Sequence, residues 1–235
     1  MKIKVLSFNI HKGMGWHRFR PTLNEVAEHI SELSPDLIFF QEILGDHVPF
    51  LMQEIWPYFC YGKNAVYMKG HFGNAILSKF PIIFYENLNL TTSRFDKRGL
   101  LHAIIQLPES HLHLLCVHLG LFKKGREIQY DKIVTYIEST IDSKEAIILG
   151  GDFNDWGSHA TIPIIHQLKL DEAFMSLHNA YAKTFPAWRP LLKLDRIYSR
   201  GLRIQKVERM MQKSWRKISD HIAINVDFVI DDSYE

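Results

Sequence analysis

Carboxylates, amides and histidines recur in this sequence at the ends of apolar segments. In "AIILGGDFN", Asp152 and Asn154 directly follow a run of aliphatic residues. Comparable polar residues end or begin further apolar segments: Asn9 in "VLSFNI", Glu42 in "LIFFQEI", Asp195 in "LKLDRIY", and Asp220 and His221 in "SDHIAI". Because burial of an unpaired carboxylate is costly, this repeated placement indicates that the segments share a cation.

The chemistry of these side chains indicates which cation. A divalent metal with oxygen ligands would offset the repulsion between Glu42, Asp152 and Asp220. Oxygen-rich ligation without a Cys/His cluster favours Mg²⁺ or Mn²⁺ over a structural zinc. A single Asp or Asn at a strand end is more often a turn residue or a helix cap, so the hypothesis rests on their joint occurrence.

Strands must position these residues, and alternate residues of a strand share a face. Four faces then combine apolar residues with polar ends: Ile3, Val5, Ser7 and Asn9; Ile38, Phe40 and Glu42; Ile148, Gly150, Asp152 and Asn154; Asp195 and Ile197. We therefore expect the polar ends to meet at one mouth of the fold.

Helices and strands alternate along the chain. "TLNEVAEHISEL" predicts a helix with Thr22 as its N-cap, and further helices are expected over 48–56, 130–141 and 161–168. The consecutive strand-like runs between 64 and 119 suggest antiparallel neighbours. Without an internal repeat or a Pro/Gly/Ser-rich linker, we expect one domain over 1–235. The predicted fold is an α/β sandwich of two mixed sheets packed face to face, with helices outside.

Bulk composition is that of an ordinary globular protein, with 46% hydrophobic and 23% charged residues. The net charge of +2 permits a phosphate-bearing partner but is far below that of dedicated nucleic-acid binders. Cys60 and Cys116 lie in apolar segments and are expected to be reduced core residues. No segment resembles a signal peptide or a membrane span, so we expect a soluble cytoplasmic protein. A monomer is favoured, and no obligate protein partner is evident.

Seven motifs in order resemble one superfamily: "SFNIH", "FFQEI", "GNAILS", "VHLG", "GGDFN", "LDRIY" and "SDH". They are similar to those of the endonuclease/exonuclease/phosphatase superfamily, over Asn9 to His221. This is the fold of deoxyribonuclease I-like nucleases, exonuclease III-type nucleases, neutral sphingomyelinases and inositol polyphosphate phosphatases. The resemblance implies a four-layer α/β sandwich. It is closest to a compact bacterial subgroup with "NIHKG", "RGLLHA" and "TFPA", to which the resemblance assigns no substrate.

The resemblance also implies roles for individual residues. Glu42 matches the principal metal ligand, with Asn9 and Asp220 beside it. Asp152 matches the aspartate that orients or deprotonates the attacking water, and Asn154 matches an amide that contacts the phosphate or the nucleophile.

Two histidines match residues that contact the scissile phosphate. His221 is the first, and Asp195 matches the carboxylate that orients it. His118 matches a second histidine of the deoxyribonuclease-like members, although a core histidine is the alternative.

Four further residues are candidates for phosphate binding: His11, Asn74, Arg98 and Arg126. Arg98 could bind a phosphate through two N–H groups, but a solvated arginine is equally compatible with its segment. Arg126 lies near a helix start, where an exposed helix face is the simpler interpretation. His11 departs from the small polar or acidic residue of exonuclease III-type members, which argues against an abasic-site repair role.

Three loops around the expected site mix aromatic and basic residues: "KGMGWHRFRP", "TFPAWRP" and "MMQKSWRK". They contain Trp16, Phe19 and Trp215 among Lys and Arg residues. Such loops could stack nucleobases and bind phosphates, or lie at a lipid interface, or simply anchor on the domain.

The sequence thus predicts a Mg²⁺- or Mn²⁺-dependent phosphodiesterase, with nucleic acid (DNA or RNA) as the leading substrate class. A phospholipid or a small phosphodiester is the first alternative. A non-catalytic binding member of the family is the second.

Overall fold

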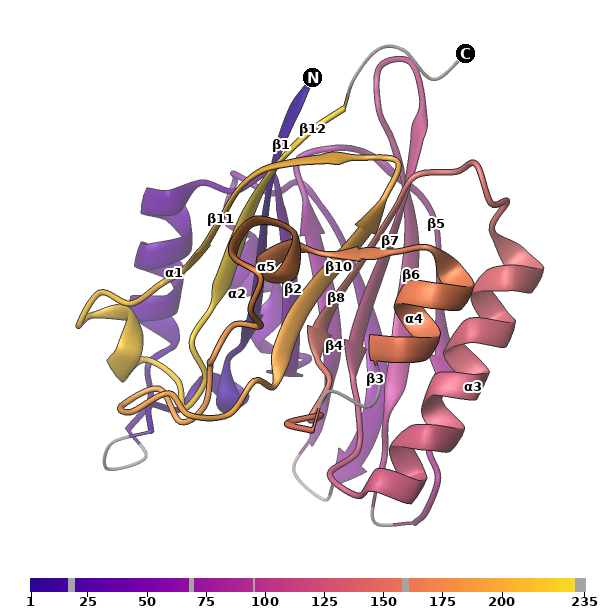
Figure 1. The fold of residues 1–235 in the computed structure, drawn as a ribbon. Helices are drawn as coiled ribbons and strands as arrows, with labels where there is room; N and C mark the ends of the chain where they lie inside the picture. The colour runs from indigo at the N-terminus through magenta and orange to yellow at the C-terminus, as the bar shows by residue number, and fades with distance from the viewer. Residues whose placement is uncertain (17–19, 68–69, 95, 158–160, 231–235) are drawn as a thin grey trace.

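Two six-stranded mixed sheets pack face to face in the computed structural model, which describes residues 1–16, 20–67, 70–94, 96–157 and 161–230 (Figure 1). The first sheet has the order β11-β12-β1-β2-β4-β3, formed by Arg203–Arg209, Ile224–Val229, Lys2–Asn9, Leu37–Leu44, Gly70–Ser78 and Tyr58–Tyr67. The second has the order β5-β6-β7-β8-β10-β9, formed by Ile82–Asn89, Gly99–Gln106, His111–His118, Ile147–Asp152, Asp195–Arg200 and Asp171–Glu172.

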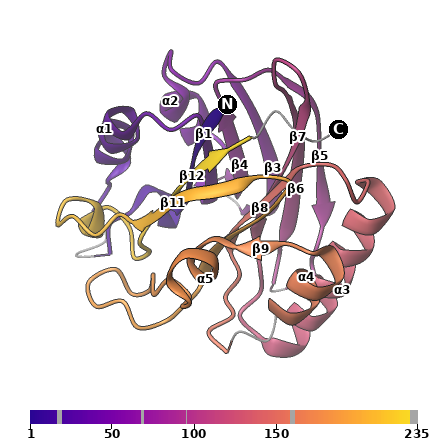
Figure 2. The same ribbon diagram turned by 45° about the horizontal axis from the view of Figure 1, so that its top comes forward.

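Helices cover the outer face of each sheet, as the predicted four-layer sandwich requires (Figure 2). On the first sheet, α1 (Leu23–Leu33) and α2 (His47–Met52) share an apolar cluster with β1, β2 and β4. On the second, α3 (Lys123–Thr140) and α4 (Thr161–Leu168) pack on β6, β7 and β8. The short α5 (Ala173–His178) contacts β10 and β11. Two 3₁₀ turns, η1 (His11–Gly13) and η2 (Trp215–Lys217), flank the strand ends. No described helix combines the length and apolar character needed to cross a membrane.

The central core lies between the two sheets. Val5 and Phe39 of the first sheet and Ile148 and Ile197 of the second belong to one buried cluster. Burial of this apolar area from both sheets is the main favourable contribution to folding. Cys60 and Cys116 belong to the same cluster as free thiols, which confirms the prediction of buried cysteines.

The directions of the strands bring the polar strand ends to one end of each sheet. β1 and β2 are parallel, and β7 and β8 are parallel, so these strands end on the same side of each sheet. β12 runs antiparallel to β1 and β10 antiparallel to β8, so their beginnings lie beside those ends. The expected meeting of strand ends is therefore a consequence of topology.

Two expectations need correction. The strand-like runs between 64 and 119 are not all neighbours, because the chain passes from the first sheet to the second between β4 and β5. Thr22 precedes α1 but does not cap it, since its hydroxyl donates to the carbonyl of Ile218 at 2.7 Å. The short elements α5, η1 and η2 were not predicted, because they are too short to show a periodic pattern.

Candidate active site

A hydrogen bond between the two sheets lies at the centre of the candidate site. The Nδ2 of Asn9, at the end of β1, donates to Oδ2 of Asp152, at the end of β8, at 3.1 Å. Both residues are buried, with 1% of their surface exposed. The side chain of Asn9 is on the same strand face as Val5, and that of Asp152 is on the same face as Ile148. Because Val5 and Ile148 lie in the central core, Asn9 and Asp152 each face the other sheet.

Glu42 reaches this mouth through a β-bulge. Simple alternation would turn Glu42 toward the helices with Ile38 and Phe40, which pack against α1 and α2. The pairing of β2 with β4 instead shifts register between Phe40 and Ile43, and Glu42 adopts a φ of 52°. A bulge re-aims a side chain in this way, and here the Glu42 carboxylate lies 4.0 Å from His118 of the second sheet. The predicted shared face of Ile38, Phe40 and Glu42 is therefore wrong, although the predicted position of Glu42 at the mouth is not.

Asp195 and His221 form a buried pair. The Nδ1 of His221 lies 2.9 Å from Oδ2 of Asp195, which fixes the orientation of the imidazole ring. The opposite nitrogen, Nε2, lies 3.7 Å from Oδ2 of Asp152. The ring of Phe185 packs on His221 with centroids 5.0 Å apart and covers one of its faces.

Mutual electrostatics set the protonation of these groups. Burial raises the pKa of Asp152 to about 7, and the negative charge of Asp195 adds to this, although His221 opposes it. Burial alone would lower the pKa of His221, but Asp195 and Asp152 outweigh burial and raise it to about 10. His221 is therefore an imidazolium at neutral pH, with its positive charge between two aspartates.

His118 has the opposite character. Its Nε2 lies 3.5 Å from Oδ2 of Asp152, and the residue is 4% exposed. Burial lowers the pKa of His118 well below its usual value, and the charges of Arg98 and His221 lower it further. The site thus contains one charged and one neutral histidine.

Asp220 joins the mouth through Ser219 and His11. The hydroxyl of Ser219 donates to the carbonyl of Asn9 at 2.7 Å, which ties the start of "SDH" to the end of β1. Asp220 is partly exposed, and its Oδ1 lies 3.8 Å from Nδ1 of His11. The backbone N–H of His11 in turn donates to Oδ1 of Asn9 at 3.1 Å.

Asn154 follows β8 in a left-handed conformation, with a φ of 49°. Its backbone N–H donates to Oδ1 of Asp152 at 2.9 Å, and its Nδ2 donates to the carbonyl of Leu119 at 2.9 Å. The backbone N–H of Asn154 therefore binds the Asp152 carboxylate, and the side-chain amide of Asn154 is fixed next to the end of β7.

The remaining candidates are dispersed. Asn74 is buried, and its Nδ2 donates to the carbonyls of Gly99 and Cys116 at 3.0 and 3.2 Å, which bridges the sheets. Arg98 lies 3.1 Å from Asp96 and lines a hollow beside Glu42. Arg126 is 4% exposed rather than on an exposed helix face, and it donates to the carbonyls of Gly120 and Leu121. These contacts occupy Arg126 with its own loop.

The aromatic loops divide between two environments. Trp16 and Trp188 stack with centroids 5.6 Å apart, and with four basic residues they line a second hollow of about 780 Å³. Trp215 is instead buried beside Phe8, so for this residue the anchoring interpretation is confirmed. Arg18 and Phe19 lie outside the described residues.

Sequence reasoning gave no specific role to Lys12 or Ser219. The Nζ of Lys12 lies 3.6 Å from Glu42 and 5.0 Å from the centre of the Phe72 ring. In the sequence, Lys12 is distinguished only by its proximity to Asn9 in "NIHKG". The left-handed conformation of Lys12, with a φ of 57°, cannot be read from the sequence. Ser219 was part of the quoted "SDH" motif, where only its neighbours were assigned roles.

The oxygen atoms at this mouth suit a hard divalent cation. Glu42 and Asp220 each keep a partly exposed carboxylate whose nearest ion-pair contacts are 3.6 Å or longer. Asp152, Asp195 and His221 also form a cluster whose ligand atoms lie within 4.8 Å of one another. A metal in that cluster would have to replace the 2.9 Å bond between Asp195 and His221, whereas a metal at the predicted set of Glu42, Asn9 and Asp220 would leave that bond in place.

Comparison with known proteins identifies the family of this chain. The model of the Endonuclease/Exonuclease/phosphatase family matches residues 6–221. The chain belongs to this family. Among curated relatives, this endonuclease/exonuclease/phosphatase chain is 36% identical over 241 residues to the uncharacterized protein YbhP of Escherichia coli strain K12, with 95% of each chain covered.

Solved structures share the endonuclease/exonuclease/phosphatase fold at low identity. The endonuclease/exonuclease/phosphatase from Beutenbergia cavernae has a TM-score of 0.83 at 15% identity, covering 97% of this chain and 72% of that one. D. rerio TDP2 complexed with single strand DNA product has a TM-score of 0.76 at 19% identity, covering 97% and 99%. Family membership supports a phosphoesterase, and the fold expected from the motifs is confirmed.

Proposed function

We propose that this endonuclease/exonuclease/phosphatase protein is a divalent-metal-dependent phosphodiesterase, with nucleic acid as its leading substrate class. The observation that carries the proposal is the buried row Asp195–His221–Asp152. A charged imidazole, fixed by one carboxylate, faces a second carboxylate whose pKa lies near neutrality. Such a row suits a reaction in which a proton leaves water while negative charge grows on a phosphoryl group.

Each residue has a definite part in this proposal. Asp152 takes the proton from water as the water oxygen bonds to phosphorus and the bond to the leaving oxygen breaks. His221 stabilises the negative charge of the phosphoryl oxygens, and Asp195 keeps it protonated and oriented. His118, which is neutral, donates a hydrogen bond to the same phosphate.

Glu42, Asn9 and Asp220 would hold the metal ion. Mg²⁺ or Mn²⁺ bound there supplies positive charge that polarises the phosphoryl group. Lys12, whose Nζ lies 3.6 Å from the carboxylate of Glu42, is the nearest ion-pair partner of that carboxylate among the described residues.

The choice of nucleic acid rests on two observations. D. rerio TDP2, which shares the fold, was solved with single strand DNA product. Basic side chains line the hollow beside Glu42 and the hollow formed by Trp16 and Trp188. A phospholipid or small phosphodiester is the second candidate, favoured by the stacked Trp16 and Trp188 among basic residues, because Trp and Lys also gather at lipid interfaces.

Hydrolysis of bis(4-nitrophenyl) phosphate by EDTA-treated protein, with and without Mg²⁺ or Mn²⁺, tests the reaction class. We expect turnover only with metal. Equal slow rates for the wild type and Asp152→Ala would favour a non-catalytic binding protein instead. Parallel assays with plasmid DNA, RNA, phospholipid vesicles and inositol phosphates then test the substrate class, and activity on lipid alone would exclude the nuclease proposal.

A further inference from the structure

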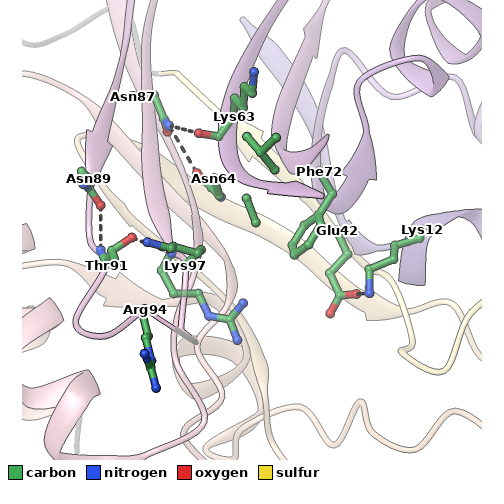
Figure 3. Close-up of a pocket in the computed structure, with 13 residues that line it drawn as sticks. Lys12, Glu42, Lys63, Asn64, Phe72, Asn87, Asn89, Thr91, Arg94 and Lys97 are labelled. Atoms are coloured by element: carbon green, nitrogen blue, oxygen red, sulfur yellow. Dashed lines mark hydrogen bonds and ion pairs between the residues drawn. The ribbon is translucent and has the colours of Figure 1, made fainter. Parts of the chain in front are cut away.

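A basic hollow of about 800 Å³ opens directly beside Glu42 (Figure 3). Among the described residues, its lining contains a single carboxylate, that of Glu42, and five cationic residues: Lys12, Lys63, Arg94, Lys97 and Arg98. We call this hollow the basic trough. Because Glu42 also lies 4.0 Å from His118, the trough adjoins the candidate active site.

One wall of the basic trough contains a hydrogen-bonded pair of amides, Asn87 and Asn64. The Nδ2 of Asn87 donates to Oδ1 of Asn64 at 3.2 Å and to the carbonyl of Lys63 at 3.3 Å, which joins β5 to β3 (Figure 3). Asn64 lies where the pairing of β3 with β4 shifts register, and a bulge of this kind redirects a side chain.

Glycines leave the space that this wall needs. A Cβ on Gly62 would lie 2.4 Å from Oδ1 of Asn87, and a Cβ on Gly99 would lie 2.1 Å from Oδ1 of Asn64. Backbone from β3, β5 and β6 therefore holds the two amides in place, so the wall is preformed.

The charge of the basic trough is only partly compensated within the protein. Lys12 lies 3.6 Å from Glu42, and Arg98 lies 3.1 Å from Asp96. Lys63 and Lys97 form no ion pair with any residue that the structure describes. An anionic ligand would supply the missing negative charge.

We infer that the basic trough binds a phosphate next to the scissile one on a nucleic-acid strand. This inference rests on the proposed function, in which the scissile phosphate lies among His221, His118 and Asp152. A strand repeats its phosphates at regular intervals, so neighbouring phosphates fall outside that cluster and require cations of their own. An acyl chain is a poor occupant, because Ala65, Val66 and Phe72 are the only apolar residues among the described lining.

Recognition in the basic trough is therefore electrostatic. Lysine and arginine contacts to phosphates carry no base information, so cleavage is expected to depend on strand length and salt more than on base sequence.

Fluorescence anisotropy of a labelled oligothymidylate with EDTA-treated protein tests this without turnover. Lys63→Gln/Lys97→Gln removes two trough charges, and Lys132→Gln/Lys144→Gln removes two exposed charges on α3 and before β8 as a matched control. We expect the trough variant to weaken binding about tenfold and to reduce the slope of log K against log salt by about 0.7, the value for one phosphate contact on a single strand. The control is expected to bind like the wild type.

Three results would overturn the inference: equal binding by the trough variant, an equal loss in the control, or tight binding of inositol hexakisphosphate with none of the oligonucleotide. The activity assay with metal distinguishes a failure of the proposed function from a failure of this inference. If the wild type hydrolyses no phosphodiester with metal, the catalytic proposal falls, whereas the anisotropy experiment still measures the trough. If the wild type is active, the trough variant should lower kcat/KM for the oligonucleotide about tenfold relative to that for bis(4-nitrophenyl) phosphate.

Discussion

Two histidines at one site carry different charges because their neighbours differ. His221 is bonded to Asp195 and also faces Asp152, whereas His118 is buried near Arg98 and His221. The same side chain can therefore serve as a fixed cation in one position and as a neutral hydrogen-bonding group in the other.

Asp195→Asn tests the source of the charge on His221. In the metal-free protein we expect the substitution to lower the pKa of His221 from about 10 by about 1 to 3, because one nearby negative charge is lost. NMR titration of the ring nitrogens measures this. An unchanged pKa would show that Asp152 alone maintains the imidazolium.

Asp152→Asn tests the proposed proton acceptor. We expect metal-dependent turnover of a phosphodiester to fall by about 10²- to 10⁴-fold, the usual contribution of general acid-base catalysis. Urea denaturation provides the control, because it separates a loss of activity from a loss of the fold. An active variant would exclude Asp152 as the base.

Sequence alone could predict most of these residues. Asp152 and Asp195 follow from alternation, since each lies on the same face as a core isoleucine. The pairing of Asp195 with His221 joins residues 26 positions apart, and only the resemblance to a family indicated it. The burial of Arg126 could not be predicted, because its hydrogen-bond acceptors are backbone carbonyls of the preceding loop and its ion-pair partner, Asp155, lies beyond the end of β8.

Elements place these residues through departures from regular geometry. Glu42 reaches the site through a bulge, and Asn64 marks a second bulge in the basic trough. A period-two pattern assigns faces correctly only where the pairing is regular, so the orientation of Glu42 could not be read from its strand.

Gly151 allows β8 to approach β7. Its φ is 142°, and a Cβ there would lie 1.9 Å from the carbonyl oxygen of Val117. We expect Gly151→Ala to destabilise the protein by more than about 1 kcal/mol, measured by urea denaturation. A matched substitution at Gly70, where a Cβ would meet nothing within 4 Å and the φ is also 142°, separates the backbone strain from the clash.

Glu172 makes the stability of the α5 region depend on pH. Its carboxylate accepts the N–H of Met175 at 2.8 Å, but burial raises the pKa of Glu172 to about 7 from an ordinary 4.5. Because the folded pKa exceeds the unfolded one, the protonated form stabilises the fold. That contribution is full below about pH 4.5 and is lost as pH rises to about 7.

Glu172→Gln should remove this dependence. At pH 8 we expect the variant to be more stable than the wild type by up to about 3 kcal/mol, and near pH 4.5 we expect equal stability. Urea denaturation at the two pH values measures the difference. A variant that is less stable at both would show that the charged carboxylate is the better helix cap.

At the scale of the whole molecule, the site joins the two sheets. Asn9 and Glu42 come from the first sheet, whereas Asp152, Asp195 and His118 come from the second. A cation at Glu42, Asn9 and Asp220 binds only the folded arrangement, so it should stabilise the protein by mass action.

Thermal unfolding with Mn²⁺ tests the location of the metal. At 100 times its Kd, Mn²⁺ should stabilise the wild type by about 2.7 kcal/mol. Glu42→Gln should lose most of this gain, whereas Asp195→Asn should keep it. The reverse result would place the metal in the Asp152, Asp195 and His221 cluster.

The pairing of β1 with β12 sets when this arrangement can first exist. Along the chain, β1 is separated from its neighbour β12 and the adjoining His221 by more than 200 residues. Until β12 pairs with β1, the first site residues lie beside an open strand edge. The proposed hydrolysis of a phosphodiester therefore requires closure of the first sheet across this long separation.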